Sequence, residues 1–276
     1  MLNRREFIKT AAAGGMALSN SAVAMPAPST GYPIIDAHSH MGEFTMFGPT
    51  LVTSPDDIAA SCKRFGITKM FVSHVIGLYY DEALGNKEVL DAVKKHPNQI
   101  GAAISFPTPY EPGILNKLER YAQLGVQMLG EVKFDTPAGD PVAAPLFQRA
   151  GELGMTILLH TSPADAGAAA ENAPAANILL AHMGTGNAIN MFDWRLAIDV
   201  ARQHKNLYLE TCTSIIDRGM IEEAVKALGP ERIVFGTDFP LLDPGVMLAK
   251  IQDARINEEA RRLILGGNMA RLLESK

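Results

Sequence analysis

Apolar runs rich in β-branched residues alternate along the chain with amphipathic stretches. The apolar runs predict eight strands, at residues 33–38, 67–74, 100–106, 127–134, 155–160, 177–182, 206–211 and 232–237. Helical periodicity predicts helices around residues 55–65, 87–96, 111–124, 143–153, 189–204, 216–228 and 244–254, and one or two more within 257–273. Strands that alternate with helices favour parallel pairing through right-handed crossovers.

Eight strand–helix units of about 30 residues each predict an α/β fold, the (β/α)8 TIM barrel, as a single domain. The competing fold is an open doubly wound sheet, which usually places a glycine-rich phosphate loop after its first strand. Residues 37–42 (AHSHMG) follow the first predicted strand and are not such a loop. The barrel is therefore the predicted fold. The stretch 164–176, rich in Ala, Gly and Pro, is left open between a short helix and a loop.

The first 24 residues have the pattern of an export signal. Arg4 and Arg5 precede a mildly apolar run over 10–18, and a small-x-small sequence ends at Ala24. The paired arginines resemble a twin-arginine signal, which predicts export to the periplasm, with a general secretory signal or an uncleaved basic tail as alternatives. The apolar run is too short to span a membrane. We expect a signal at 1–24, a lead-in at 25–32 and the barrel at 33–276.

Composition narrows the class of protein only a little. The 276 residues are 47% hydrophobic and carry a formal charge of −5, which gives no basic footprint for nucleic acid. The two cysteines, Cys62 and Cys212, lie far apart and do not form a disulfide framework, so both are expected to be small buried hydrophobes. The partner expected is a small-molecule substrate, and the sequence does not predict an oligomeric state.

A His-x-His pair stands at the end of the first predicted strand. Residues two apart in a strand point to the same side, so His38 and His40 aim their imidazoles at one point. Neutral imidazole is the commonest protein metal ligand, and one ion can accept both rings. The alternative for this pair alone is two polar histidines in a surface loop.

Polar side chains also follow most of the later predicted strands. The active site of a TIM barrel lies at the carboxyl ends of its strands. The residues at those positions are His74, Glu131, Lys133, His160, His182, Glu210 and Asp238.

Five segments together resemble the amidohydrolase superfamily, in its type 2 branch. They are residues 36–40 (DAHSH), 158–161 (LLHT), 180–184 (LAHMG), 235–240 (FGTDFP) and the closing 267–273 (GNMARLL). The resemblance implies a divalent metal held by His38, His40, His160 and Asp238. Such a ligand set suits zinc, with manganese or iron as alternatives, and an open position lowers the pKa of a bound water toward about 7. The resemblance also implies that Asp238 is the general base and that His182 polarises the substrate or carries a proton.

The fourth predicted strand resembles that of the TatD-like nucleases, because Glu131 stands in residues 130–135 (GEVKFD). Those relatives hold two metals with His, His, Glu, His, His and Asp, and this chain offers the same residue types in the same order. Glu131 is thus a candidate metal ligand of a site with one ion, or with two. The alternative is a Glu131–Lys133 charge pair beneath a site with one metal.

The function expected is a metal-dependent hydrolase that uses a metal-activated water on an amide, lactone or ester. A decarboxylase of a small aromatic or unsaturated acid is the first alternative, and Arg195 is the only cation that the sequence suggests for its carboxylate. A TatD-like phosphodiesterase or nuclease and a non-enzymatic metal-binding barrel are the others. Glu210 is left open between a substrate contact and a residue that orients a ligand, His74 between a pocket residue and a strand cap, while Asp36 is expected to orient.

Overall fold

This computed structural model describes residues 31–45, 50–186 and 193–274. The predicted export signal at 1–24 and most of the lead-in lie outside the described residues. So do Met46 and Phe47 of the loop after the first strand, and the predicted start of the helix at 189–204.

A ring of parallel strands forms the centre of the molecule. The described residues contain eight of them: β1 (Ile35–Phe44), β3 (Lys69–His74), β4 (Ile100–Ile104), β5 (Met128–Val132), β6 (Thr156–Leu159), β7 (Asn177–Leu180), β8 (Leu207–Glu210) and β9 (Ile233–Val234). Each pairs in parallel with the next, from β1 to β9. The ring closes where Ala37 N–H donates to the Phe235 carbonyl at 3.0 Å and Asp238 N–H donates to the His38 carbonyl at 2.7 Å. The predicted TIM barrel is confirmed.

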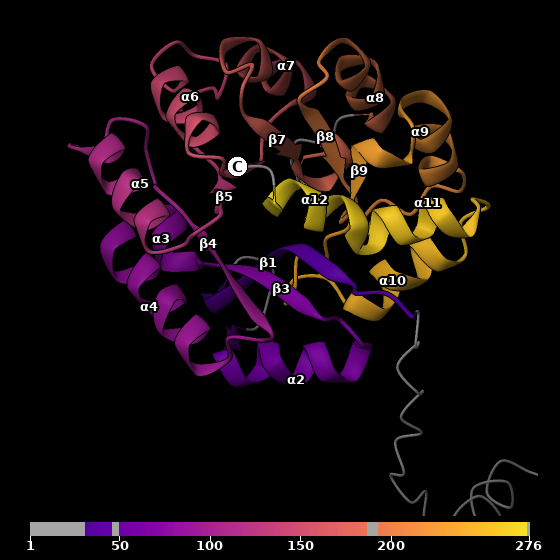
Figure 1. Cartoon of the computed structure of the whole chain (residues 1–276), viewed down its shortest axis with the longest axis horizontal. Helices are drawn as coiled ribbons and strands as arrows, with labels where there is room; N and C mark the ends of the chain where they lie inside the picture. The colour runs from indigo at the N-terminus through magenta and orange to yellow at the C-terminus, as the bar shows by residue number, and fades with distance from the viewer. Residues whose placement is uncertain (1–30, 46–49, 187–192, 275–276) are drawn as a thin grey trace, which may run out of the picture.

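Helices surround the strands, as Figure 1 shows. They are α2 (Pro55–Phe65), α4 (Glu82–Lys95), α5 (Ile114–Gln123), α6 (Ala144–Glu152), α7 (Pro163–Asn172), α8 (Trp194–Gln203), α9 (Met220–Leu228) and α10 (Pro244–Gln252), followed by α11 (Glu258–Arg262) and α12 (Asn268–Glu274). The larger apolar core lies between the strands and these helices, and a smaller one fills the barrel. Met269 and Leu272 of α12 belong to the inner core, so α12 closes the amino-terminal end of the barrel.

Helix α2 shows how local sequence sets an element's limits. The Ser54 side chain accepts from Asp57 N–H, and the Asp57 carboxylate accepts from Ser54 N–H, which together form a capping box. Pro55 occupies the first turn, where a missing N–H costs nothing. Gly66 ends the helix at φ 69°, a left-handed conformation that glycine adopts without strain. The predicted range 55–65 is confirmed.

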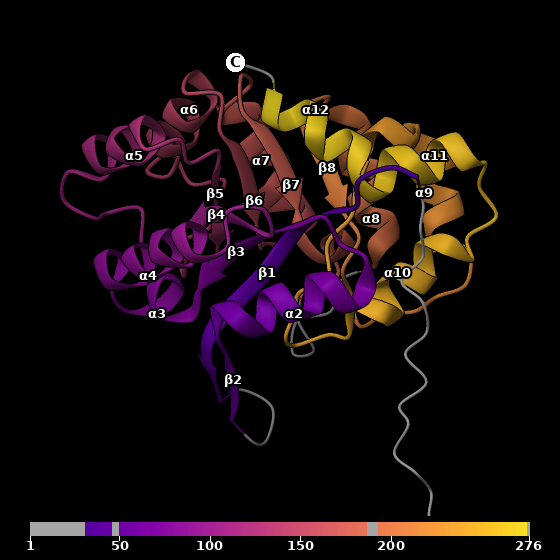
Figure 2. The ribbon, with the colours of Figure 1, turned by 60° about the horizontal axis from the view of Figure 1, so that its bottom comes forward.

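At the carboxyl ends of the strands two features differ from the prediction, and the 164–176 stretch, left open between a helix and a loop, is helical as far as Asn172. β1 continues beyond His38 to Phe44, because β2 (Leu51–Thr53) pairs with it antiparallel and extends the sheet. A short helix, α3 (Val75–Tyr79), follows β3 directly, and the 164–176 stretch forms α7, capped by Ser162. β2 is too short to carry a periodic signal, which explains why the pattern missed it. Figure 2 places β2 and α12 at opposite ends of the barrel.

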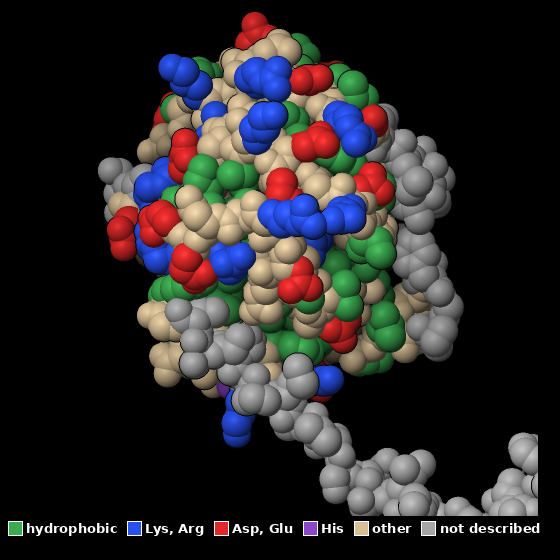
Figure 3. All heavy atoms as spheres, turned by 90° about the vertical axis from the view of Figure 1, so that its right-hand side faces the viewer, with side chains coloured by type: hydrophobic (Ala, Val, Ile, Leu, Met, Phe, Trp, Pro, Cys, Tyr) green, Lys and Arg blue, Asp and Glu red, His purple; other side chains and the backbone are tan. Residues whose placement is uncertain are grey.

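The surface adds two observations. No helix within the described ranges is long and apolar enough to cross a membrane. On the face seen in Figure 3, lysine and arginine side chains are interspersed with aspartate and glutamate, and no patch of a single sign covers that face.

Candidate active site

The two histidines of β1 turn their Nε2 atoms toward each other. These atoms lie 3.1 Å apart. The other ring nitrogens are occupied, because His38 Nδ1 lies 3.1 Å from Glu210 Oε2 and His40 Nδ1 lies 2.8 Å from Ser73 Oγ. The register of β1 against β3 shifts between Asp36 and Ser39, an irregularity of the kind that re-aims side chains at active sites. Both Nε2 atoms are therefore held inward and are free to bind a ligand.

His38, His40 and Asp238 form what we call the first donor group. Asp238 Oδ1 lies 3.2 Å from His40 Nε2 and 3.7 Å from His38 Nε2. All three side chains are buried. Asp238 has φ 56°, which is uncommon for a residue other than glycine, and its N–H donates to the His38 carbonyl. This backbone bond aims the carboxylate across the barrel mouth at the histidines.

Glu131, His160 and His182 form the second donor group. Glu131 Oε1 lies 2.5 Å from His160 Nδ1 and 3.7 Å from His182 Nε2, and the two imidazole nitrogens are 3.2 Å apart. His182 has φ 59° and Met183 has φ 53°, so with Asp238 three non-glycine residues of the described ranges adopt left-handed backbone conformations. Such conformations cluster at functional sites, where the surrounding structure must hold them.

The Glu131 carboxylate lies between the two groups. Its Oε1 is 3.5 Å from His38 Nε2, and its Oε2 is 3.7 Å from His40 Nε2. The six side chains of the two donor groups therefore form one continuous cluster. Within it, His160 lies with Glu131 and His182 rather than with the β1 histidines, where the predicted ligand set had placed it. Glu131 is thus not paired with Lys133, since its near neighbours are imidazoles.

The spacing of the donor atoms fits divalent metal ions. Atoms that share a tetrahedral ion at about 2.1 Å lie about 3.4 Å apart. The Nε2 and Oδ1 atoms of the first donor group are separated by 3.1, 3.2 and 3.7 Å. The second group has 3.2 and 3.7 Å separations, along with the shorter His160–Glu131 contact. A mixture of imidazole and carboxylate donors suits zinc, and also manganese or iron.

The electrostatics of the cluster also favour a cation. Burial raises the pKa of Glu131, but the imidazoles of His160, His182 and His38 outweigh burial and hold that pKa well below its ordinary value. Burial lowers the pKa of His38, while Glu210, Glu131 and Asp238 raise it to about 10. The carboxylates thus stabilise positive charge at the position of the imidazoles, and a divalent cation meets the same demand.

Two fully buried carboxylates, those of Asp36 and Glu210, lie inside the barrel beneath the histidines and hydrogen-bond to them. Asp36 accepts from His38 N–H at 2.9 Å and from Thr237 N–H at 3.0 Å, so it ties β1 to the end of β9. Burial raises the pKa of Asp36 to about 6 in spite of these bonds. Glu210 faces His38 Nδ1 and accepts from His182 N–H at 3.1 Å. Both carboxylates orient the histidines and do not line the pocket above them.

Cys212 belongs to this lower layer, which the sequence analysis did not foresee. Its Sγ lies 2.9 Å from Glu210 Oε2 and 3.2 Å from Nδ1 of both His38 and His182. Burial and the Glu210 charge raise the pKa of the thiol well above its ordinary value, so it stays protonated and donates to Glu210. The sequence does contain one indication of this position: Cys212 follows Glu210 by two residues, a spacing that places both side chains on one face of an extended chain. Cys62 is a buried core residue, as expected.

A small hollow opens above the cluster. Its volume is about 30 Å³, and it opens to solvent. Its lining comprises His40, Phe44, Leu78, Tyr79, Glu131, Lys133, His160, His182, Asp238 and Leu241.

The cation beside this hollow is Lys133, and the expectation that Arg195 would serve there is wrong. Arg195 is exposed, lies over the Trp194 ring and pairs with Asp193 and Glu223. His74 does not line the hollow and is the N-cap of helix α3, because its Nδ1 accepts from Ile76 N–H. Burial alone lowers the pKa of Lys133, but Glu131 and the groups around it raise it, so the ammonium is charged.

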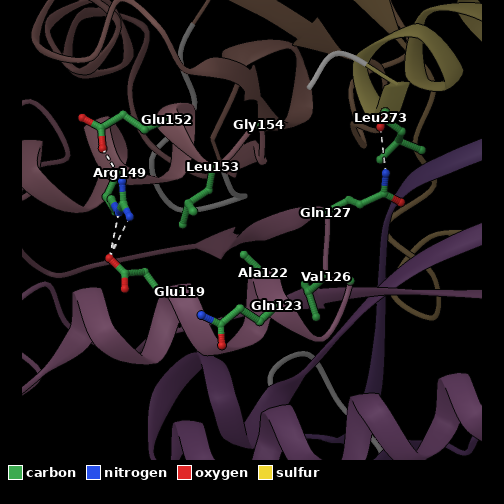
Figure 4. Close-up of a pocket in the computed structure, with 11 residues that line it drawn as sticks. Glu119, Ala122, Gln123, Val126, Gln127, Arg149, Glu152, Leu153, Gly154 and Leu273 are labelled. Carbon is green, nitrogen blue, oxygen red and sulfur yellow. Dashed lines mark hydrogen bonds and ion pairs between the residues drawn. The ribbon is translucent and has the colours of Figure 1, made fainter.

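A larger hollow, of about 660 Å³, lies at the opposite end of the barrel. Figure 4 shows the contacts of its charged side chains: Arg149 pairs with Glu119 and Glu152, and beside them Gln127 Nε2 donates to the Leu273 carbonyl. Because none of the donor residues described above lines it, this hollow offers no comparable chemistry.

Comparisons with known proteins identify a family model that matches the chain and solved structures that share its fold. A family model described as amidohydrolase matches residues 35–274. No curated protein matches the chain in sequence.

Several solved structures share the fold. A 5-carboxyvanillate decarboxylase from Sphingomonas paucimobilis is 17% identical, with a TM-score of 0.69, and the match covers 88% of this chain and 99% of that one. A dihydroxybenzoic acid decarboxylase from Polaromonas sp. JS666, solved with manganese and 2-nitroresorcinol, is also 17% identical, with a TM-score of 0.68 and coverage of 88% and 97%. A candidate 2-pyrone-4,6-dicarboxylic acid hydrolase from Pseudomonas putida is 17% identical, with a TM-score of 0.67 and coverage of 88% and 98%. At these identities the similarity establishes the fold alone.

Proposed function

The chain belongs to the amidohydrolase family and is an enzyme, and from that premise we propose that it is a hydrolase of a small carbonyl substrate that uses two divalent metal ions. The observation that carries this proposal is the place of Glu131. Its two oxygens face His38 and His40 on one side, and its Oε1 faces His160 and His182 on the other. A carboxylate that faces two clusters of donors could serve a pair of neighbouring ions, as two-metal sites require ligands on both sides.

Each donor group then has a defined role. His38, His40 and Asp238 would hold one ion, His160 and His182 the other, and Glu131 would reach both. Ions bound there polarise a carbonyl oxygen and make a water molecule acidic enough to react near neutral pH. Asp238 would accept the proton from that water, since its carboxylate belongs to the first donor group and also lines the hollow. His182 would be a ligand in this arrangement rather than a proton carrier.

The identity of the ions is a separate part of the proposal. We propose zinc, because imidazole nitrogens dominate the donor set and zinc binds such sets tightly. Manganese is the alternative, and it is the ion present in the decarboxylase from Polaromonas sp. JS666. Elemental mass spectrometry of the purified protein distinguishes the two.

A panel of substrates tests the reaction. Neutral esters, lactones and amides are assayed by acid release, hydroxybenzoates by release of carbon dioxide, and bis(4-nitrophenyl) phosphate by release of nitrophenolate. We expect turnover in the first set that is lost on chelation and restored by metal. Carbon dioxide release without turnover of the carbonyl compounds would overturn the proposal in favour of a decarboxylase.

Decarboxylation is the second candidate, because Lys133 offers the cation that a substrate carboxylate needs and it lines the hollow. Two of the three solved structures described above are named as decarboxylases, although at 17% identity they support the fold and not the reaction. Preferential turnover of the phosphodiester would point instead to the TatD-like reaction.

Glu210→Gln tests how the site is held. The carboxylate orients His38 through Nδ1, and loss of such a partner typically lowers metal affinity about 10- to 100-fold. We expect that loss in a competition assay with a fluorescent chelator, with an unchanged circular dichroism spectrum. Glu152→Gln, at the opposite end of the barrel, should bind metal like the wild type. Wild-type affinity in Glu210→Gln would show that Glu210 does not orient the ligand.

A further inference from the structure

Lys133 differs from every other half-buried cation that the structure describes. Each of the others donates to a carboxylate or a carbonyl oxygen: Lys69, Lys117, Arg149, Arg232, Lys250, Arg261 and Arg262. Within the described ranges Lys133 makes no ion pair, and its Nζ lies 5.7 Å from the centroid of the Tyr79 ring. The carboxylates of Glu131 and Asp238 favour the charged ammonium without a direct ion pair, and a ligand that supplies an anion would give it one.

The hollow gives this ammonium a defined surrounding. Lys133 follows Glu131 by two residues at the end of β5, so both side chains leave the strand on the same side. Tyr79, Phe44, Leu78 and Leu241 form the apolar part of the lining. A ligand that fits has an apolar body against these side chains and an anionic group beside Lys133.

The charge balance of the site favours an anion as well. The cluster and the layer beneath it contain four buried carboxylates, those of Asp36, Glu131, Glu210 and Asp238. Two divalent ions, bound as proposed, would balance these four charges and leave the Lys133 ammonium in excess. A hollow lined by an excess positive charge, with low-dielectric walls, attracts anions and repels cations.

We propose that Lys133, together with Tyr79, recognises a carboxylate on the substrate, so that the enzyme acts on small organic acids with an apolar body. The inference deepens the proposed function, because it takes the hollow above the two donor groups as the substrate site. The carboxylate meets Lys133, while the carbonyl under attack faces the donor groups. Lys133 is then a specificity-determining residue and takes no part in the proton transfers.

Binding of benzoate and benzamide to the metal-loaded protein tests the proposal, because the two probes share a shape and differ in charge. Isothermal titration calorimetry should show that the wild type prefers benzoate. Lys133→Met should lose about 10- to 100-fold of the benzoate affinity, the usual effect of a charge-assisted hydrogen bond, and leave benzamide affinity unchanged. Lys133→Arg should retain part of the preference. Lys226→Met, which removes an exposed lysine of α9, should behave like the wild type.

The possible outcomes separate this inference from the proposed function. Equal benzoate affinity in the wild type and Lys133→Met would overturn it, as would an equal loss of both probes. If the protein hydrolyses esters, Lys133→Met should lower kcat/KM for a half-ester of a dicarboxylic acid more than for a neutral ester, and an equal fall for both would show instead a role in the reaction. A lost benzoate preference in a protein that binds two ions but hydrolyses none of the panel would support the carboxylate subsite and count against the hydrolase.

Discussion

Glu131→Gln is expected to bind one divalent ion in place of two and to lose about 10²- to 10³-fold of kcat/KM. The neutral amide keeps the shape of the side chain but removes the negative charge that faces His38, His40 and His160. The second donor group then has two imidazoles and a weak amide oxygen, which do not hold an ion firmly. Elemental mass spectrometry counts the ions, and steady-state kinetics on the best panel substrate gives the loss.

Glu152→Gln is the matched control, since it makes the same change at an exposed position beside Arg149. It should retain the wild-type metal content and kcat/KM. Two ions and full activity in Glu131→Gln would contradict the role given to this carboxylate. The second ion would then be held without the Glu131 carboxylate.

Asp238→Asn is expected to lower kcat about 10²- to 10⁴-fold, the range for removal of a general base. The amide cannot accept the proton, and it is also a poorer ligand at 3.2 Å from His40 Nε2, so bound metal should fall as well. The fold should persist, because the side chain lies at the barrel mouth while the apolar cores lie inside and around the strands. Kinetics, elemental analysis and thermal unfolding measure the three effects.

Asp199→Asn provides the comparison, since Asp199 is an exposed aspartate of α8. It should leave all three quantities at wild-type values. Wild-type kcat in Asp238→Asn would remove Asp238 from the reaction. If Asp238→Asn does not fold, Asp238→Glu tests the role of Asp238 as the base instead. This variant keeps a carboxylate and should retain part of the wild-type kcat.

The barrel and the residues at its mouth could be predicted from the sequence, because both depend on patterns among residues close together in the chain. The spacing of His38 and His40 places two rings on one side of a strand, and the barrel topology brings the later strand ends to the same mouth. The family resemblance added the order of the remaining residues. Neither the residue pattern nor the family resemblance gives the distances between side chains on different strands.

The features that the sequence missed depend on those distances. That Glu131 lies between two histidine groups follows from the positions of β1, β5 and β6 around the ring. Cys212 was expected to be a core hydrophobe, because nothing in the chain shows that β8 places its thiol beneath His38 and His182. Arg195 was chosen as the site cation for its position in the chain, but α8 turns it to the surface, where carboxylates pair with it.

The number of divalent ions per folded chain, measured together with activity before and after chelation, tests the central claim most directly. The account predicts two ions in the purified or metal-reconstituted protein, loss of hydrolysis on chelation, and recovery when the metal is restored. One ion with full hydrolytic activity would contradict the two-ion site and leave a hydrolase with a single metal. Undiminished activity in protein stripped of metal would contradict the account as a whole.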